Sequence, residues 1–182
     1  RTKAYLDGDE WVINGEKCWI TNASYARQVV VTAVTGQDER GKNIITAIIV
    51  PTDTPGVTIR SDYQKMGVRA SNTCEIVLEN VRVPKENILG DEKKGFGQFL
   101  NTLDGGRISI AALSVGIAQS AFEKALQYAK ERVQFGQSIS KLQAIQFKLA
   151  DMAMEIELAR TMVQKAAWLK DHGKPFKKEA AY

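Results

Sequence analysis

The spacing of apolar residues changes once along the chain, near residue 91, and this change limits the fold more than any other feature. Before it, short apolar runs are separated by Gly, Pro, Asn and Asp. After it, no proline occurs between Pro84 and Pro175, and apolar residues recur every three or four positions. Alternating spacing is typical of strands, and the longer spacing is typical of helices. The sequence therefore predicts a β domain over residues 1–91 and a helical domain over residues 92–182.

The β part contains about six strand-like segments with no helical stretch between them. Such a series predicts an antiparallel sandwich or barrel, so the fold class of the whole chain is α+β. The Asn14–Gly15 pair is the strongest short hairpin signal in this part. The segments read EWVING, EKCWIT, QVVVTAVT, NIITAIIV, GVTIRSD and TCEIVLENVRV.

The helical part predicts two long helices, over residues 95–132 and from about residue 141 to His172. Between them the segment RVQFGQSIS breaks the pattern, and we expect Gly136 to cap the first helix and Ser140 the second. Each helix carries one apolar stripe that is expected to face inward. On the first helix these positions are Leu100, Leu103, Ile110, Leu113, Ile117 and Ala121. Two helices do not close a bundle, so we expect further sequence to supply the rest.

Composition and charge exclude several classes of protein. With 44% hydrophobic and 25% charged residues, the chain has an ordinary globular composition. It has no apolar run of about 18 residues, so no membrane span is expected. Cys18 and Cys74 lie far apart and are expected to be reduced and half-buried, and the one histidine, His172, lies in a helix-end signal. A disulfide scaffold, a zinc site and a Ser-His-Asp mechanism are therefore not expected.

The helical part is basic, with 14 Lys and Arg against 9 Asp and Glu. This excess fits an anionic ligand such as a phosphate-bearing cofactor. Nucleic acid is not expected as a partner, because the basic residues alternate with acids along the helices and no aromatic platform accompanies them.

Three segments leave alternatives open when only their residues are considered. In EKCWITNA, residues 16–23, Trp19 and Thr21 either pack and turn or hold something flat and polar, and packing is favoured. Gly105 and Gly106 each cost about 1 kcal/mol relative to alanine inside a helix, so they mark a kink or a close approach. The glycines of KKGFGQF are a weak phosphate signal and are more ordinary as a lead into a helix.

Several motifs occur together in one order: NGEKCWITNA, GVRASNTCEIVLENVRVPKENILG, GFGQFLNTLDGGRISIAALSVG, ERVQFGQSISKLQ and KPFKKEAA. In this combination the chain resembles the acyl-CoA dehydrogenases, and most closely the short-chain, butyryl-CoA type. The resemblance implies a middle β-barrel domain followed by the start of a C-terminal helical bundle. It also implies a homo-oligomer, expected to be a tetramer, in the bacterial cytoplasm or the mitochondrial matrix.

The same resemblance implies a reaction. Members of the family bind FAD and desaturate an acyl-CoA thioester between its α and β carbons. A glutamate removes the α proton, a hydride passes to flavin N5, and the electrons go on to an electron-transferring flavoprotein. An oxidase that delivers electrons to oxygen, and a binding module without catalysis, are the alternatives.

The family pattern assigns two elements of this sequence to the cofactor. In the first, Trp19 would lie beside the flavin ring, the Ile20 backbone at the ring edge, and the Thr21 hydroxyl near N5. In the second, Arg132 would pair with the pyrophosphate across a subunit boundary. The other residues of the second element are Phe135 near the adenine, Gln143, and, with less support from the pattern, Gln134.

The pattern assigns a third group to the substrate. Asp104 and Arg107 would contact the CoA arm, Gly105 and Gly106 would leave room for it, and Phe96 would touch the CoA moiety. Some relatives carry the catalytic glutamate at the position of Gly106, which has no side chain here. The base is therefore expected beyond Tyr182.

Overall fold

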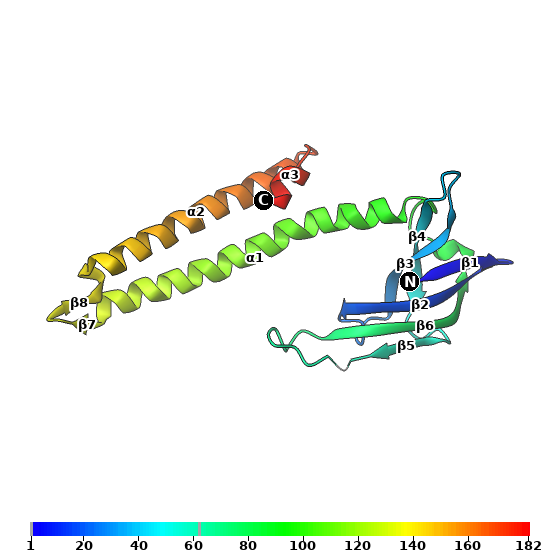
Figure 1. Cartoon of the computed structure of the whole chain (residues 1–182), viewed down its shortest axis with the longest axis horizontal. Helices are drawn as coiled ribbons and strands as arrows, with labels where there is room; N and C mark the ends of the chain where they lie inside the picture. The colour runs from blue at the N-terminus through cyan, green and yellow to red at the C-terminus, as the bar shows by residue number, and fades with distance from the viewer. Residues whose placement is uncertain (1, 62) are drawn as a thin grey trace. The chain divides into compact units, whose positions relative to one another are not determined.

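The computed structural model describes residues 2–61 and 63–182 and divides into two compact units. The first unit extends to Phe99 and the second runs from Leu100 to Tyr182. The β segments lie in the first unit and most of the helical sequence lies in the second (Figure 1). The domain boundary between residues 91 and 92 stays a prediction, because the division between the units falls inside a helix.

The first unit is built on one six-stranded sheet with the order β4-β3-β1-β2-β6-β5. Neighbouring strands are antiparallel except β1 and β3, which meet in parallel at Lys3 and Val34. The strands are β1 (Lys3–Asp7), β2 (Glu10–Thr21), β3 (Gln28–Gln37), β4 (Asn43–Pro51), β5 (Val57–Arg60) and β6 (Thr73–Pro84). The expected β domain is confirmed, with the two segments EWVING and EKCWIT joined into the single strand β2.

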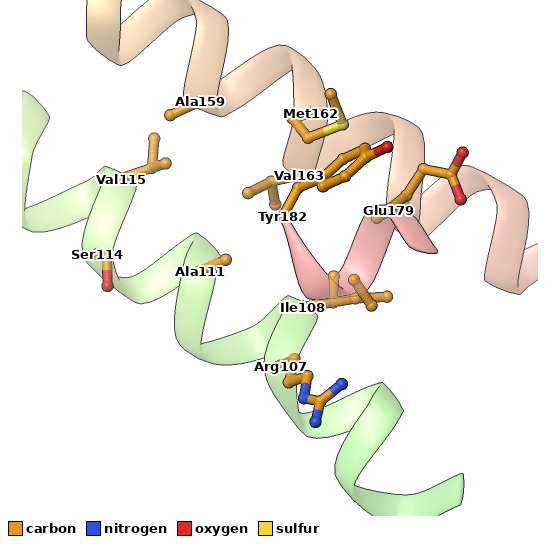
Figure 2. Close-up of a pocket in the computed structure, with 12 residues that line it drawn as sticks. Arg107, Ile108, Ala111, Ser114, Val115, Ala159, Met162, Val163, Glu179 and Tyr182 are labelled. Carbon is orange, nitrogen blue, oxygen red and sulfur yellow. The ribbon is translucent and has the colours of Figure 1, made fainter. Parts of the chain in front are cut away.

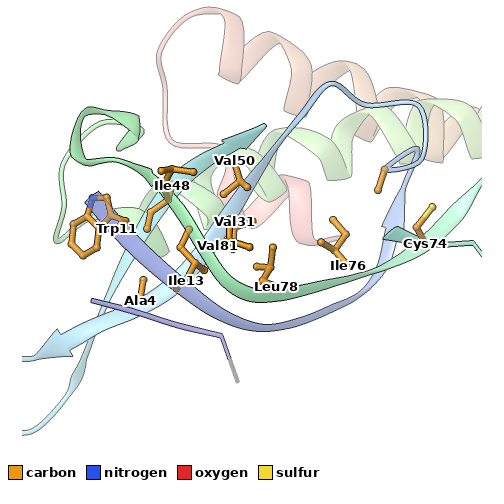
Figure 3. Packing of buried hydrophobic residues seen from close by; sticks show 13 residues of the cluster. Ala4, Trp11, Ile13, Val31, Ile48, Val50, Cys74, Ile76, Leu78 and Val81 are labelled. Atoms are coloured by element: carbon orange, nitrogen blue, oxygen red, sulfur yellow. The ribbon is translucent and has the colours of Figure 1, made fainter. Parts of the chain in front are cut away.

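The sheet encloses its own hydrophobic core. Side chains from β3 and β4, such as Val31 and Ile48, face side chains from β2 and β6, such as Ile13 and Leu78 (Figure 3). All four are almost fully buried. Side chains alternate between the faces of a strand, but the outer face is not exposed throughout, because Val12, Ala47 and Val77 are also buried.

The Asn14–Gly15 pair does not form the hairpin that its sequence indicates. It lies inside β2 at a shift of register with β6, where Gly15 has φ +141°. A Cβ at Gly15 would lie 2.5 Å from the Cα of Thr2, so no other residue fits without movement. Tertiary contacts therefore turned a local turn signal into a bulge, and the hairpin between β1 and β2 is made instead at Gly8.

The segment after β6 is bound to β4. It includes the short 3₁₀ turn η1 (Lys85–Asn87), and the Leu89 N–H donates to the Ala47 carbonyl at 2.8 Å. The buried Thr46 hydroxyl donates to the Glu92 carbonyl. At Gly95, a Cβ would lie 2.5 Å from the Ala47 nitrogen, so glycine lets the helix start against the strand backbone.

The helices follow the predicted ranges closely, but their caps differ. Gly105 and Gly106 do not interrupt the first helix. Gly136 and Ser140 are not caps, because a small hairpin and a 3₁₀ turn lie between the helices and the N-cap of the second is Leu142. The elements are α1 (Gly95–Glu131), β7 (Val133–Gln134), β8 (Gln137–Ser138), η2 (Ile139–Lys141), α2 (Gln143–Asp171) and α3 (Lys177–Ala181).

Within the second unit, α1 meets α2 through a face other than the predicted stripe. Ile108, Ala129 and Ala166 are the buried apolar residues, and Arg160 on α2 donates to the Gln119 side chain on α1 at 2.7 Å. The predicted stripe of α1 was expected to be buried, but its large residues are exposed: Leu100, Leu103, Ile110, Leu113 and Ile117. The described residues of this unit contain too few helices to cover that side of α1.

Candidate functional site

The expected flavin-ring segment lies at the end of β2, where the strand bulges. Lys17 pairs with Ile76 and Ile20 pairs with Cys74, so Cys18 and Trp19 together lie opposite the single residue Glu75. Trp19 adopts φ +57°, and 75% of its surface is exposed. The bulge therefore turns the indole outward, and the interpretation that Trp19 packs in the core is wrong for this chain.

The three residues of the WIT run divide between the two faces of the strand. Ile20 packs against the hydrophobic core, whereas Trp19 and Thr21 are both exposed. The Thr21 hydroxyl has no hydrogen-bond partner among residues 2–61 and 63–182. An exposed aromatic face can pack against a flat ring, and an unengaged hydroxyl can donate a hydrogen bond to it, so these residues fit a flavin.

The conformation of Trp19 is costly. A non-glycine residue in the left-handed region costs roughly 1–3 kcal/mol, and such strain is found mainly where function requires it. Here the strain lies in the residue that the sequence assigns to the flavin ring. This observation favours a binding role over a purely structural one.

Lys17 lies on the inner side of the same strand, immediately before the bulge. Its ammonium donates to the Thr32 carbonyl at 2.6 Å and to the Thr32 hydroxyl at 3.3 Å, joining β2 to β3 where the short strand β1 does not lie between them. Burial lowers the pKa of the Lys17 ammonium below its ordinary value. Among the described residues, no carboxylate forms an ion pair with it.

The lowered pKa of Lys17 predicts how stability depends on pH. As pH rises toward 10.5, the folded chain loses this proton before the unfolded chain does, so the free energy of unfolding should rise in that window. Replacing Lys17 with methionine should remove this rise. The measurement is urea unfolding at a series of alkaline pH values, with Lys42→Met, an exposed lysine of the β3–β4 loop, as the control. The same alkaline rise in the Lys17 variant would contradict the prediction.

The second expected cofactor element is the two-strand hairpin between α1 and α2. Its turn residues, Phe135 and Gly136, have φ +52° and +74°, which is the type I′ turn of tight hairpins. Asparagine or glycine normally fills the first turn position, but here it is a phenylalanine with 89% of its surface exposed. As at Trp19, the chain places a large aromatic residue outward at a strained position.

Arg132 immediately precedes this hairpin and is held firmly by its backbone. Its N–H donates to the Tyr128 carbonyl, and its carbonyl accepts from the Ile139 N–H, both at 2.8 Å. Its side chain is exposed and forms no ion pair with any described residue. Gln134 and Gln143 are exposed on the same connection. A fixed backbone with an unpaired guanidinium suits a phosphate-bearing ligand.

The expected substrate group lies on α1, and its carboxylate is already engaged. The Asp104 side chain is only 12% exposed, and it pairs with Arg107 at 3.4 Å and with Lys177 at 3.5 Å. Because Lys177 belongs to α3, this pair joins α3 to α1. Asp104 thus has a structural role in the second unit, whereas the exposed Arg107 keeps donors for a ligand. Phe96, in the first unit, is also exposed.

The two helix glycines differ in the space around them. A Cβ at Gly105 would lie 2.9 Å from the Lys170 ammonium, whereas a Cβ at Gly106 would meet nothing within 4 Å. Packing within this unit therefore gives a partial reason for glycine at position 105. It gives no reason for glycine at position 106.

Replacing Gly106 with alanine should raise the free energy of unfolding by about 0.4–1 kcal/mol, because the residue is helical and unobstructed. If Gly106 instead leaves room for substrate, the same change should raise the KM for an acyl-CoA. Thermal unfolding and steady-state kinetics on the full-length protein measure the two effects. A loss of stability in Gly106→Ala would contradict the prediction. The control is Gly116→Ala, at another unobstructed glycine of α1, which should also raise stability but leave the KM unchanged.

A small apolar groove lies beside this group, between α1, α2 and α3 (Figure 2). It has a volume of about 220 Å³ and is lined by Ile108, Val115, Met162 and Tyr182, among others. Arg107 and Glu179 supply its charged groups. The groove therefore offers an apolar surface next to the Arg107 guanidinium.

The substrate group and the second cofactor element lie at opposite ends of α1. With a rise of 1.5 Å per residue, Asp104 and Arg132 are separated by roughly 40 Å along the helix. The two groups of one chain therefore do not form one compact site.

Two protein-family models match nearly the whole chain. The middle domain of the acyl-CoA dehydrogenases matches residues 1–81, and their C-terminal domain matches residues 93–182. The chain belongs to the acyl-CoA dehydrogenase family. The expected resemblance and the α+β fold class are both confirmed.

Individual relatives agree with this assignment. The chain is 75% identical over 182 residues to "Probable acyl-CoA dehydrogenase YngJ" of Bacillus subtilis, covering all of this chain and 48% of that protein. It is 50% identical to the mitochondrial short-chain specific acyl-CoA dehydrogenase of Bos taurus, covering 99% of this chain and 43% of that one. Butyryl-CoA dehydrogenase from Megasphaera elsdenii superposes with a TM-score of 0.93 at 47% identity, over all of this chain and 47% of that structure. The chain thus spans about half the length of these relatives.

Two further properties come from the described residues. They include no helix that is long and apolar enough to cross a membrane. They also include no group of three or more His, Cys, Asp or Glu side chains that could hold a metal ion. Both cysteines are free, but Cys18 is exposed and Cys74 is buried rather than half-buried.

Proposed function

We propose that the protein containing this chain is an FAD-dependent acyl-CoA dehydrogenase that acts on short-chain thioesters. The observation that carries this proposal is the bulge at the end of β2. It presents the Trp19 indole and the Thr21 hydroxyl on the exposed side of the strand, at a cost in backbone strain. Family membership and the short-chain and butyryl-CoA relatives support the same substrate class.

The residues of the bulge have distinct parts in this proposal. Bound FAD would accept the hydride from the substrate β carbon. Trp19 would cover the flat ring and exclude water from one side of it. The Thr21 hydroxyl would donate a hydrogen bond at N5, where charge develops as the hydride arrives, and such a donor stabilises the transition state selectively. Ile20, fixed in the core, would hold its backbone at the ring edge.

A second subunit completes the cofactor site in this proposal. Arg132 would pair with the pyrophosphate, Phe135 would pack near the adenine, and Gln143 and Gln134 would donate hydrogen bonds. Because the hairpin lies roughly 40 Å along α1 from the substrate group, it would serve the FAD of a partner protomer. We propose that the assembly is a homotetramer, as expected from the sequence.

Arg107 and the space at Gly106 would receive the CoA arm, with Phe96 near the CoA moiety. Asp104 would act mainly by orienting Arg107, since its carboxylate lies 3.4 Å from that guanidinium. The base is proposed to be a glutamate outside residues 1–182, because position 106 carries no side chain. The electrons would pass to an electron-transferring flavoprotein, in the bacterial cytoplasm or the mitochondrial matrix.

The test is anaerobic reduction of the purified full-length protein. We expect a yellow protein with a flavin spectrum that bleaches on addition of butyryl-CoA and bleaches more slowly with a long-chain acyl-CoA. Reoxidation should be fast with electron-transferring flavoprotein and slow with oxygen. Fast reoxidation by oxygen would favour an oxidase. A colourless protein that binds no FAD would reject the proposal.

A further inference from the structure

Asn72, the residue before β6, uses both its backbone and its side chain to hold the segment that follows Thr21. Its carbonyl accepts from the Asn22 N–H at 3.1 Å. Its side-chain oxygen accepts from the Ser24 hydroxyl at 2.9 Å and from the Cys74 thiol at 2.7 Å. Its side-chain amide donates to the Ser61 hydroxyl at 2.7 Å. One side chain therefore links the turn after β2, the loop after β5 and the start of β6.

The segment held by Asn72 is a short turn that follows directly on Thr21. It is also held at Ala23, which lies in the hydrophobic core, and at Ala26, whose carbonyl accepts from the Thr52 hydroxyl at 2.7 Å. Asn22 adopts φ +61°, and its carbonyl accepts from the Tyr25 and Ala26 N–H groups, which forms a tight turn. Ala23 is buried, but Thr21, Asn22 and Ser24 are exposed. Thr21 pairs with Thr73 of β6 and is the last sheet residue before a turn that the hydrogen bonds to Asn72 help to hold.

We propose that Asn72 is a positioning residue that fixes the orientation of the Thr21 hydroxyl toward the flavin ring. This inference rests on the proposed function, because it requires a flavin at Thr21. It adds a residue that the cofactor does not touch, far from Thr21 in the sequence. A hydroxyl that must meet N5 within hydrogen-bond reach tolerates little displacement, so a loosened turn should slow the reaction.

The side chain of asparagine suits this position better than its near relatives. Alanine would remove the bonds to Ser24, Cys74 and Ser61 together. Aspartate would keep the acceptor for Ser24 but lose the amide that donates to Ser61. Ser24→Ala removes only one of the three bonds, at an exposed site where folding should be little affected. These variants therefore form a graded series.

The experiment is a double-mutant cycle between Asn72→Ala and Thr21→Val in the FAD-loaded, full-length protein. We expect Asn72→Ala to retain FAD and to slow flavin reduction by about 10-fold or more. In that background the effect of Thr21→Val, about 100- to 1,000-fold in the wild type, should shrink by about 10-fold or more, because the hydroxyl is already misplaced. Ser24→Ala should give a smaller change in the same direction, which keeps the test valid if Asn72→Ala does not fold.

Two further measurements separate positioning from general stability. Hydrogen exchange of the Asn22 amide should accelerate in Asn72→Ala while exchange in β3 and β4 does not change. The matched control is Asn87→Ala, which loses a side-chain hydrogen bond to the Ile49 carbonyl in the same unit. It should lower stability but leave the full effect of Thr21→Val.

The outcomes distinguish the two proposals. If the protein binds FAD and the double variant slows flavin reduction by the product of the two single effects, the positioning role of Asn72 is wrong. The proposed function would then still stand. A wild-type protein that binds no FAD would overturn the proposed function and this inference with it.

Discussion

Replacing Thr21 with valine in the FAD-loaded, full-length protein is expected to slow flavin reduction by about 100- to 1,000-fold. The variant removes one hydrogen-bond donor and keeps the shape of the side chain. A donor that acts only in the transition state typically contributes about 2.7–4 kcal/mol. Because Thr21 is exposed and its hydroxyl is not engaged by the described part of the chain, no internal hydrogen bond is lost, and stability should change little.

Rapid mixing with butyryl-CoA under anaerobic conditions measures this rate. Thr58→Val is the matched control, since Thr58 is an exposed strand threonine of the same sheet. FAD content and the KM for substrate should stay close to the wild-type values in both variants. An unchanged reduction rate in Thr21→Val would show that the hydroxyl does not act at N5.

The division of the chain and most element bounds could be predicted because they depend on local spacing. The predicted helix over residues 95–132 and the observed helix Gly95–Glu131 differ by one residue, since a proline-free segment with helical periodicity has few alternatives. Asn14–Gly15 failed as a hairpin because pairing of β2 with β6 extends through it, and Thr2 closes over the glycine. Tertiary contact overrode the local preference there.

The candidate site could be predicted in part. The resemblance singled out Trp19 and Thr21, but the residues alone favoured a packed indole, because nothing in the sequence shows that the strand bulges there. Lys17 and Asn72 were missed, since each acts through hydrogen bonds to distant segments, Thr32 in one case and Ser24 and Ser61 in the other. Short sequence patterns do not indicate hydrogen bonds between residues that lie far apart in the sequence.

Asp104 forms two ion pairs, of which only one could be predicted from the sequence. Its pairing with Arg107 is local, at a spacing of three residues on one helix, and could have been foreseen. Its pairing with Lys177 is not local and depends on the turn at Gly173, which has φ +62° and directs the chain toward α3. A carboxylate that the family pattern assigns to the substrate thus also holds this unit together.

Replacing Arg132 with alanine is expected to weaken FAD binding by roughly 30-fold or more. Truncating one partner of a hydrogen-bonded charge pair typically costs about 2–5 kcal/mol, much of it from leaving the other charge unpaired. The Arg132 backbone is anchored on both sides by hydrogen bonds at 2.8 Å, so the hairpin should persist and only the guanidinium should be lost. Flavin release, followed by fluorescence on dilution, measures the effect.

Lys148→Ala is the control for net charge, because it removes one exposed cation from the same basic half of the chain. Binding should be nearly unchanged in that variant, whereas the loss in Arg132→Ala should be largest at low salt, where the pair with the pyrophosphate is least screened. Arg132→Lys should recover only part of the affinity, since an ammonium cannot make the paired, planar contacts of a guanidinium.

Because the hairpin is proposed to serve the FAD of a partner protomer, light scattering should also show weaker assembly in Arg132→Ala when FAD is depleted. A monomeric Arg132→Ala protein that still binds FAD as tightly as the wild type would contradict both the contact and its place at a subunit boundary.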